Sequence, residues 1–422
     1  MPECVHHSVV IEHNAGAAPG RGCVPISRAS FRVHFVMKSV PVYIIAAKRT
    51  AIGRIGGLHR VRRVEDLAAP VVEAVLKDAG IAVDEVDEFI VGNCTAGDNP
   101  ARLIALASGL PVTAMATTVD QQCASGLEAI LAAARRIAAG EASIVVAGGV
   151  ESLSTAPWRI AKPRNLFQTP HFIRPDPFGA PPMAEHVPHT SCEALAQRLG
   201  ISREQQDAWA VKSHARATLA REARRFVGEI VPLRSTTEEA RDQSAGEPDL
   251  EDLADLEPIC GDNGTLTIGN ISALHDGAAF VVAISEAEWK RRGRPPALRP
   301  ALNAALGVEP GKEAEAPMAA LHKLYGRMNG LDRSTITAFE LSEASAVQVI
   351  ALCRQLELDE DAVNPDGGAV VRGHPLGASG AVLVVRLFSR LVRHDERRGP
   401  RYGVAALGAN GGLGLAALFE RV

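Results

Sequence analysis

The chain has few of the features that mark specialised classes of protein. Aromatic residues make up only 4% of its 422 residues, and its seven cysteines are scattered without a Cys-x-x-Cys pair. The cysteines suggest neither a disulfide framework nor a zinc site, so we expect no metal. No apolar run reaches the roughly 18–20 residues that cross a bilayer, so we expect no membrane partner. A reducing, cytoplasmic setting is the expectation.

The charge balance also argues against one class of partner. The formal net charge is −4 and the chain has no long basic run, which argues against nucleic acid as a partner. With 46% hydrophobic and 22% charged residues, the composition is that of a globular enzyme. The length leaves room for two or three domains, or for one large duplicated one.

The first residues stand apart from the rest. Residues 1–36 show no sustained helix or strand period, and the first strand-like run is "VPVYIIAA" at 40–47. Glu3 and Glu12 and the lack of an amphipathic basic pattern argue against a targeting peptide. We expect residues 1–38 to form a poorly ordered extension.

After this extension, apolar strand-like runs alternate with Ala/Leu-rich helical segments. This order predicts a layered α/β fold. The predicted elements are a strand at 40–47, a helix at 64–80 closed by Gly80, a strand at 86–94, a helix at 123–140 and a strand at 142–151.

The C-terminal part repeats this order. It reads as a helix at 318–330, a strand at 336–343, a helix at 378–391 that begins with Ala-Ser-Gly, and a strand at 402–412. The matching order and spacing predict an internal duplication with two similar α/β halves, 39–288 and 295–422. Residues from about 153 to 265 break the pattern with proline, histidine and acidic stretches. We interpret them as a loop domain inserted in the first half, a natural place for substrate recognition.

One cysteine lies at a junction that suits a nucleophile. Cys123 stands in "QQCASGLEAI" (121–130), just ahead of a predicted helix. A lone cysteine is more often a small buried hydrophobe. The free N–H groups and the positive end of a helix dipole would, however, favour a thiolate.

The matching junction in the second half carries a histidine. In "NPDGGAVVRGHPLGASG" (364–380), seven residues are glycine or proline, which predicts a tightly turned loop. His374 precedes the second Ala-Ser-Gly helix and is a candidate base for the thiol. A structural turn with an incidental histidine is the alternative.

These segments resemble the thiolase family of acyl-CoA C-acyltransferases, of the acetyl-CoA acetyltransferase and 3-ketoacyl-CoA thiolase type. The resemblance runs from about residue 40 to the end and also includes "GGVES" (148–152), "GNISALHDGAA" (269–279) and "GANGGLG" (408–414). It implies a thiolase-like duplicated α/β fold whose inserted domain holds coenzyme A. It implies that Cys123 accepts the acyl group, that His374 activates it, and that Ser272 lines the coenzyme A channel. It further implies acyl-CoA substrates, no other cofactor, and a homodimer or homotetramer.

The sequence departs from the family at two motifs. The family's Cys-x-Gly, whose cysteine moves the proton of the α-carbon, reads Gly408-Ala409-Asn410 here. The family's Asn-Glu-Ala-Phe, which holds a water for an oxyanion hole, begins with Ser342. Loss of a positioned proton-transfer group typically costs roughly 10²–10⁴-fold in rate. Candidate substitutes are Ser342, Asn410 and His275, which stands where the family usually has asparagine, and, in the inserted domain, His186 or His189.

Three functions remain open on this basis. The first is a thiolase that makes or cleaves 3-ketoacyl-CoA through an acyl-cysteine. The second keeps the acyl-cysteine but passes the acyl group to water or to another acceptor, as a thioesterase or a different acyltransferase. The third is a non-catalytic thiolase-like subunit that binds acyl-CoA.

Overall fold

The structure is a computed structural model that describes residues 40–163, 165, 167–173, 188–234, 238–243, 248–394 and 401–422. The chain divides into one unit of residues 1–38 and a second of residues 39–422. The predicted N-terminal extension and His186 lie outside the described residues. The second unit contains all the elements discussed below.

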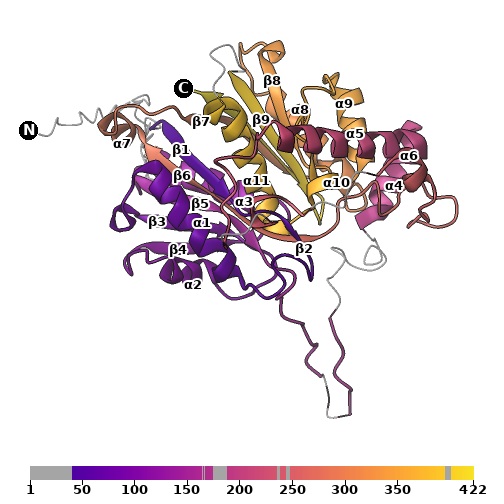
Figure 1. Ribbon diagram of the computed structural model, residues 1–422, viewed down its shortest axis with the longest axis horizontal. Helices are drawn as coiled ribbons and strands as arrows, with labels where there is room; N and C mark the ends of the chain where they lie inside the picture. Colours follow the sequence, from indigo (N-terminus) through magenta and orange to yellow (C-terminus); the bar gives the residue numbers. More distant parts are fainter. Residues whose placement is uncertain are drawn as a thin grey trace, which may run out of the picture. The chain divides into compact units, whose positions relative to one another are not determined.

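A single mixed sheet forms the framework of this unit (Figure 1). Its strands lie in the order β4-β3-β5-β6-β1-β7-β10-β9-β8, and the short β2 pairs with β6 off this path. The strands are β1 (Val42–Arg49), β2 (Gly53–Arg54), β3 (Glu88–Gly92), β4 (Met115–Val119), β5 (Ile144–Glu151), β6 (His275–Ser285), β7 (Leu298–Gly307), β8 (Ile336–Leu341), β9 (Tyr402–Ala409) and β10 (Leu413–Arg421).

The strand order contains the predicted duplication. In the first half β3 runs parallel to β4 and β5, and β6 then pairs antiparallel with β5 and β1. In the second half β8 runs parallel to β9, and β10 pairs antiparallel with β9 and β7. A parallel bridge from Phe339 of β8 to Val363 takes the place of β4. The halves meet where Ile44 of β1 pairs with Leu298 of β7.

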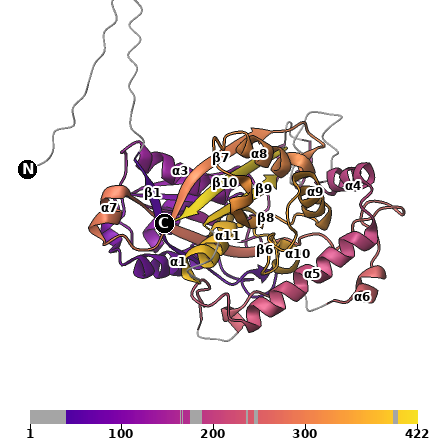
Figure 2. The same cartoon turned by 90° about the horizontal axis from the view of Figure 1, so that it is seen from above.

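Helices cover the sheet on both faces. Figures 1 and 2 show α3 and α11 at the centre of the unit. The helices are α1 (Val64–Ala79), α2 (Pro100–Ala107), α3 (Ser125–Ala138), α4 (Pro188–Leu199), α5 (Arg203–Glu222), α6 (Leu250–Ala254), α7 (Glu286–Arg291), α8 (Ala316–Tyr325), α9 (Ala346–Leu356), α10 (Ala369–Arg372) and α11 (Leu376–Phe388).

Burial of apolar side chains explains this layering. One cluster joins α3 and α11 to strands of both halves, a second gathers around α1 and α2, and a third around α8 and α9. Strands β5 and β6 are buried along their full length, which fits their apolar runs at 144–150 and 278–284, because both faces of these strands are covered. Gly80 ends α1 in the left-handed conformation (φ 61°) that its missing Cβ permits. The predicted α/β thiolase-like fold is confirmed.

The segment between β5 and β6 supplies α4, α5 and α6. Ser202 caps α5 by accepting from the backbone N–H of Gln205, whose side chain accepts from Ser202 in return. Farther along, the segment is anchored to the core by buried charges. The Arg49 guanidinium pairs with Glu229 at 2.9 Å and with Asp242 at 2.6 Å, and Arg386 also pairs with Glu229.

Candidate active site

The loop before α3 bends sharply to present Cys123. Gln122 adopts a positive φ of 54°, a rare conformation for a residue with a side chain. Its carbonyl accepts hydrogen bonds from the Ser125 hydroxyl at 2.6 Å and from the Cys94 thiol at 3.1 Å, and the Asp120 carboxylate accepts from its N–H at 3.0 Å. These bonds hold the turn ahead of Cys123 in a strained conformation.

The Cys123 sulfur is buried and protonated at neutral pH. The backbone N–H groups of Asn410 and of Cys123 itself lower the pKa of the thiol, but burial has the larger effect and raises it to about 12. Helix α3 begins only at Ser125, two residues later. The helix start therefore does not make the sulfur anionic by itself, contrary to our expectation, because the cost of desolvation outweighs the dipole. The thiol needs a base during the reaction.

Glycines bring the two Ala-Ser-Gly helices together at their N-terminal ends. A Cβ on Gly126 would lie 2.6 Å from the Gly377 carbonyl oxygen and 2.9 Å from the Ala381 nitrogen. A Cβ on Gly380 would lie 2.6 Å from the Leu127 nitrogen. Each helix thus packs against the backbone of the other. The loops that carry Cys123 and His374 lie directly ahead of these contacts.

His374 is buried and neutral. Its Nδ1 hydrogen-bonds with the Ser379 hydroxyl at 2.8 Å, one turn into α11. Burial, with a smaller effect of His275, lowers the pKa of His374 to about 4. The imidazole therefore carries no charge at neutral pH and can accept a proton.

A segment of the "GNISALHDGAA" motif connects the histidine loop to the "SEAS" loop (342–345). Leu274 bridges to His374, while the His275 N–H donates to the His374 carbonyl at 3.2 Å. Ser272 donates from its N–H to the Ala344 carbonyl at 3.1 Å. The structure therefore places His275 against the histidine loop and Ser272 against the 342–345 loop. The His275 ring donates from Nδ1 to the Ala273 carbonyl at 2.9 Å.

A buried carboxylate supports both catalytic loops. Glu151, at the end of β5, accepts from the N–H groups of Cys94 at 3.1 Å, Thr95 at 3.2 Å and Gly377 at 3.0 Å. Burial raises the pKa of Glu151, and its negative charge raises the pKa of Cys123. Because Gly377 opens α11, Glu151 fixes the start of this helix beside the nucleophile loop.

Ser342 lies beside His374. The two residues line a pocket of about 400 Å³ together with Ser379, and Arg372 lies on its wall. The next residue, Glu343, is buried and accepts from Trp209 at 3.2 Å, Ser213 at 3.0 Å and the Val370 N–H at 3.1 Å. Glu343 thereby ties helix α5 to the histidine loop.

The last glycine-rich loop supplies a backbone group but leaves no room for a side chain at its first position. The Asn410 N–H interacts with the Cys123 sulfur. Positive φ angles fall on the following Gly411 and Gly412 and not on Asn410, so this contact does not depend on a left-handed asparagine. A Cβ on Gly408 would come within 2.9 Å of Pro317 Cδ. Position 408 is therefore packed.

Sequence reasoning missed the supporting residues of the site. Glu151, Ser379 and Cys94 contact the catalytic loops through hydrogen bonds. The "GGVES" motif carried a signal for Glu151, since a glutamate at the end of an apolar strand is unusual. The sequence does not indicate the strained conformation of Gln122, because only the geometry of the turn shows it.

Two features are absent from the described residues. No group of three or more His, Cys, Asp or Glu side chains in this part of the chain could hold a metal ion. Within the same residues, no helix is both long and apolar enough to cross a membrane.

Comparison with known proteins places the chain in a family. The sequence models for the thiolase N-terminal and C-terminal domains match residues 42–287 and 299–421. The chain is 37% identical over 396 residues to an acetyl-CoA acetyltransferase of Shinella zoogloeoides, covering 90% of this chain and 99% of the relative. It is 36% identical over 401 residues to a probable acetyl-CoA acyltransferase of Staphylococcus aureus (strain COL), with the same coverage.

A solved structure agrees. The crystal structure of the Bacillus anthracis acetyl-CoA acetyltransferase matches with a TM-score of 0.83 and 34% identity, over 91% of this chain and 99% of that one. The family models cover most of this chain in two successive parts, one for each half of the sheet. The chain therefore belongs to the thiolase family and is an acyltransferase of the thiolase type.

Proposed function

We propose that this thiolase-type acyltransferase carries its acyl group on Cys123, with His374 as the base. One observation carries the proposal: a neutral buried thiol and a neutral buried imidazole lie on the loops ahead of two helices that touch at their first turns. A structural pair would need neither the strained turn at Gln122 nor the N–H groups directed at the sulfur.

The first half-reaction uses groups that the chain supplies. With Nδ1 donating to Ser379, Nε2 of His374 takes the Cys123 proton while the sulfur attacks the thioester carbon of acyl-CoA. In this proposal the N–H groups of Asn410 and Cys123, which interact with the sulfur, stabilise the resulting oxyanion. The carbon–sulfur bond to coenzyme A then breaks, and the leaving thiolate takes the proton back from His374. The acyl group remains as a thioester on Cys123.

The second half-reaction distinguishes two functions. Formation or cleavage of a carbon–carbon bond requires a group that moves the α-carbon proton, and Gly408 has no side chain to do so. His275 is the candidate we favour, because its ring lies close enough to His374 to lower its pKa. Ser342 is the other candidate, since it shares a pocket with His374. With such a substitute, the enzyme makes or cleaves 3-ketoacyl-CoA.

The packing at Gly408 favours the alternative function, in which the acyl group passes to an acceptor other than coenzyme A. Gly408 supplies no side chain, and a Cβ at this position would lie 2.9 Å from Pro317 Cδ. The acyl-cysteine would then transfer its acyl group to water or to an acceptor other than coenzyme A. Product analysis separates the two: 3-ketoacyl-CoA supports thiolase chemistry, and free acid or another acyl conjugate supports the alternative.

Mass spectrometry tests the shared intermediate. Incubation with short-chain acyl-CoA should add one acyl mass to Cys123, and Cys123→Ala should lose both the adduct and coenzyme A release. Cys260→Ser, which changes a half-buried thiol of the inserted lobe, serves as the control and should retain both. Release of coenzyme A at the wild-type rate by Cys123→Ala would refute the proposal.

We further propose a cytoplasmic homodimer or homotetramer. Strand β4 is an edge strand of the sheet, and it carries an exposed Met115 beside exposed leucines of α2. An exposed apolar sheet edge is typical of a surface that another strand or subunit covers. This exposed edge supports an oligomer, and the mass in solution gives the number of its chains.

A further inference from the structure

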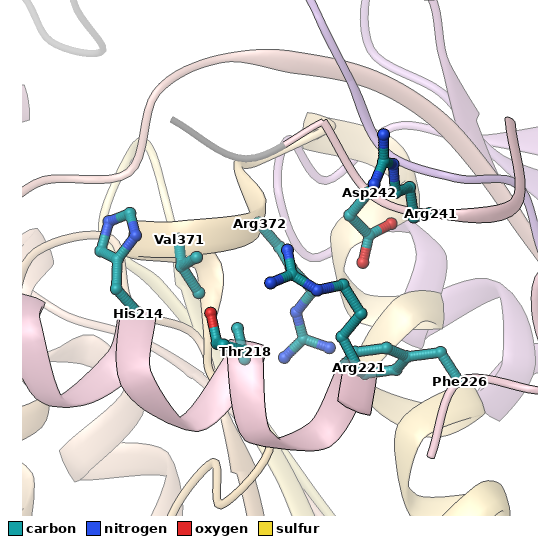
Figure 3. A pocket seen from close by; sticks show the side chains of 9 residues that line it. His214, Thr218, Arg221, Phe226, Arg241, Asp242, Val371 and Arg372 are labelled. Carbon is teal, nitrogen blue, oxygen red and sulfur yellow. The ribbon is translucent and has the colours of Figure 1, made fainter. Parts of the chain in front are cut away.

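A second pocket lies between the histidine loop and helix α5 of the inserted domain, and it shares Arg372 with the pocket at His374 (Figure 3). It encloses about 420 Å³, part of it open to solvent. Its walls are formed by His214, Ala217, Thr218, Arg221, Phe226, Arg241, Asp242, Val371 and Arg372. Figure 2 shows α5 passing beside α10, the short helix that ends at Arg372.

Arg372 is the unusual member of this lining. Its side chain is buried, with 5% of the residue exposed. Nη2 donates to the Gly367 carbonyl, but Nη1 is buried without a hydrogen-bond partner. A guanidinium stays charged in proteins, and a buried charge without a partner is strongly destabilising. The structure therefore leaves one strong donor of Arg372 to be satisfied by something else.

The remaining walls add positive charge. In Figure 3 the guanidinium groups of Arg221 and Arg372 both extend into the middle of the pocket. Arg241 lies across from them. The single carboxylate among the lining residues, Asp242, already accepts two hydrogen bonds from Arg49, at 2.6 and 3.0 Å. Three arginines and one carboxylate thus line the pocket among the described residues.

The charges around Arg372 do not offset the cost of burying its guanidinium. Burial is the main cause that lowers the pKa of Arg372, and the positive charge of Arg386 lowers it further. Glu340 and Asp242 act in the opposite direction without reversing the shift. Phe226 separates the pocket from the buried core charges, with the Arg386 guanidinium 4.7 Å and that of Arg49 5.7 Å from the centre of its ring.

We propose that this pocket binds a small oxyanion of the phosphate class between Arg372 of the histidine loop and Arg221 of the inserted lobe. The fork of a guanidinium group matches two oxygens of a phosphate, sulfate or carboxylate. The bound anion would satisfy the free donor of Arg372 and hold α5 against a loop whose His374 is two residues away. The proposal does not depend on the acyl transfer.

The phosphate group can come from two sources. One is free inorganic phosphate. The other is a phosphate ester at the adenosine end of coenzyme A, which adenosine 3′,5′-bisphosphate represents. Both present the same chemistry to the arginines, so the test includes both ligands.

Isothermal titration at constant ionic strength, with chloride as the background anion, tests the proposal. The wild-type protein should bind phosphate or the bisphosphate with a saturable heat. Arg372→Met should weaken binding at least about tenfold, because it removes charge-assisted hydrogen bonds. Arg221→Gln should weaken it at least about threefold on the same grounds. The control is Arg198→Gln, at an exposed arginine of α4, which should bind within about twofold of the wild type.

The pattern of binding identifies the source. Binding of the bisphosphate alone, lost in Arg372→Met, supports the site and assigns it to coenzyme A. Binding of both ligands supports a site for free phosphate. Absence of saturable binding of either ligand by the wild type overturns the proposal, as does equal affinity in Arg221→Gln, a variant at an exposed position that does not threaten folding.

Urea unfolding gives a second readout of the same site. Without phosphate, Arg372→Met should be at least as stable as the wild type, because it replaces a buried unpaired charge with an apolar side chain. Phosphate should raise the unfolding midpoint of the wild type and leave that of Arg372→Met unchanged. A wild type that phosphate does not stabilise, or a variant that it stabilises equally, contradicts the proposal.

Discussion

At the scale of single residues, the site combines two groups that are both neutral before reaction. Burial raises the pKa of the Cys123 thiol to about 12 and lowers that of His374 to about 4. In the mechanism that we propose, a thiolate therefore forms only when His374 takes the proton as substrate binds. The N–H groups of Asn410 and Cys123 stabilise that thiolate, because both lower the pKa of the sulfur.

This arrangement predicts an unusual pH dependence. Only neutral His374 accepts the proton, and it is lost as the pH falls through about 4. The rate of Cys123 acylation should therefore be nearly constant from about pH 5.5 to pH 8, whereas a histidine with an ordinary pKa of about 6.5 would lower it about tenfold at pH 5.5. Rapid-quench mass spectrometry of the acyl-enzyme measures this rate.

The hydrogen bond that His374 Nδ1 donates to the Ser379 hydroxyl provides a second test of the base role of His374. Ser379→Ala removes the partner of His374 Nδ1 and should slow acylation while leaving coenzyme A binding unchanged. A single acid limb near pH 6.5 in the wild-type protein would contradict a buried, neutral His374.

At the scale of elements, glycine decides how closely the catalytic helices approach. Gly126 and Gly380 occur at matching positions of the two Ala-Ser-Gly sequences, and each lies against the backbone of the other helix. Gly149 of β5 adds a third close approach, since a Cβ there would lie 2.1 Å from the Gly377 carbonyl oxygen. These contacts bring the two loops of the site together.

A single methyl group should disturb this packing. In Gly126→Ala the new Cβ would meet backbone atoms that cannot move independently of α11, so we expect a loss of roughly 3 kcal/mol in the free energy of unfolding. Acylation of Cys123 should fall in the folded fraction, because α11 shifts with His374. Urea unfolding and the acyl-enzyme assay measure the two effects.

Gly307→Ala is the matched control for this substitution. No atom lies within 4 Å of a Cβ at Gly307, and its φ is not in the left-handed region. This variant should retain stability and acylation. Equal stability of Gly126→Ala and Gly307→Ala would show that the helices tolerate a wider spacing.

At the scale of the whole molecule, the described surface leaves one sheet edge uncovered. Met115 of β4 is 65% exposed and Val112 just before it 74% exposed. Leu103 and Leu106 extend the apolar area along α2, which packs beside β4. An edge strand can pair with another strand, because no neighbouring strand of its own sheet pairs with its outer side.

A charge on this edge should dissociate the proposed oligomer. Met115→Lys places a charge among apolar side chains at the edge, so the mass in solution should fall to that of one chain. Light scattering after size exclusion measures this mass. Lys290→Gln, at an exposed position of α7, is the control and should leave the mass unchanged. A wild-type protein that is already monomeric would contradict the proposed assembly.

Sequence patterns predicted most of the elements around the site. The helix that follows Cys123 and the strand that ends at Glu151 lie within two residues of their predicted bounds, because apolar periodicity over long segments is a strong signal. The strong bend at Gln122 and the packing beside Gly408 could not be predicted, since both depend on neighbours distant in the sequence.

The sequence alone determined the family, the duplicated α/β order and the candidate pair of Cys123 and His374. These follow from periodicity and motif residues, which are local properties of the chain. Only the tertiary structure decided the protonation of that pair and left a buried donor of Arg372 without a partner. Burial sets both, and it depends on segments of the two halves and the inserted domain that meet only in the folded chain.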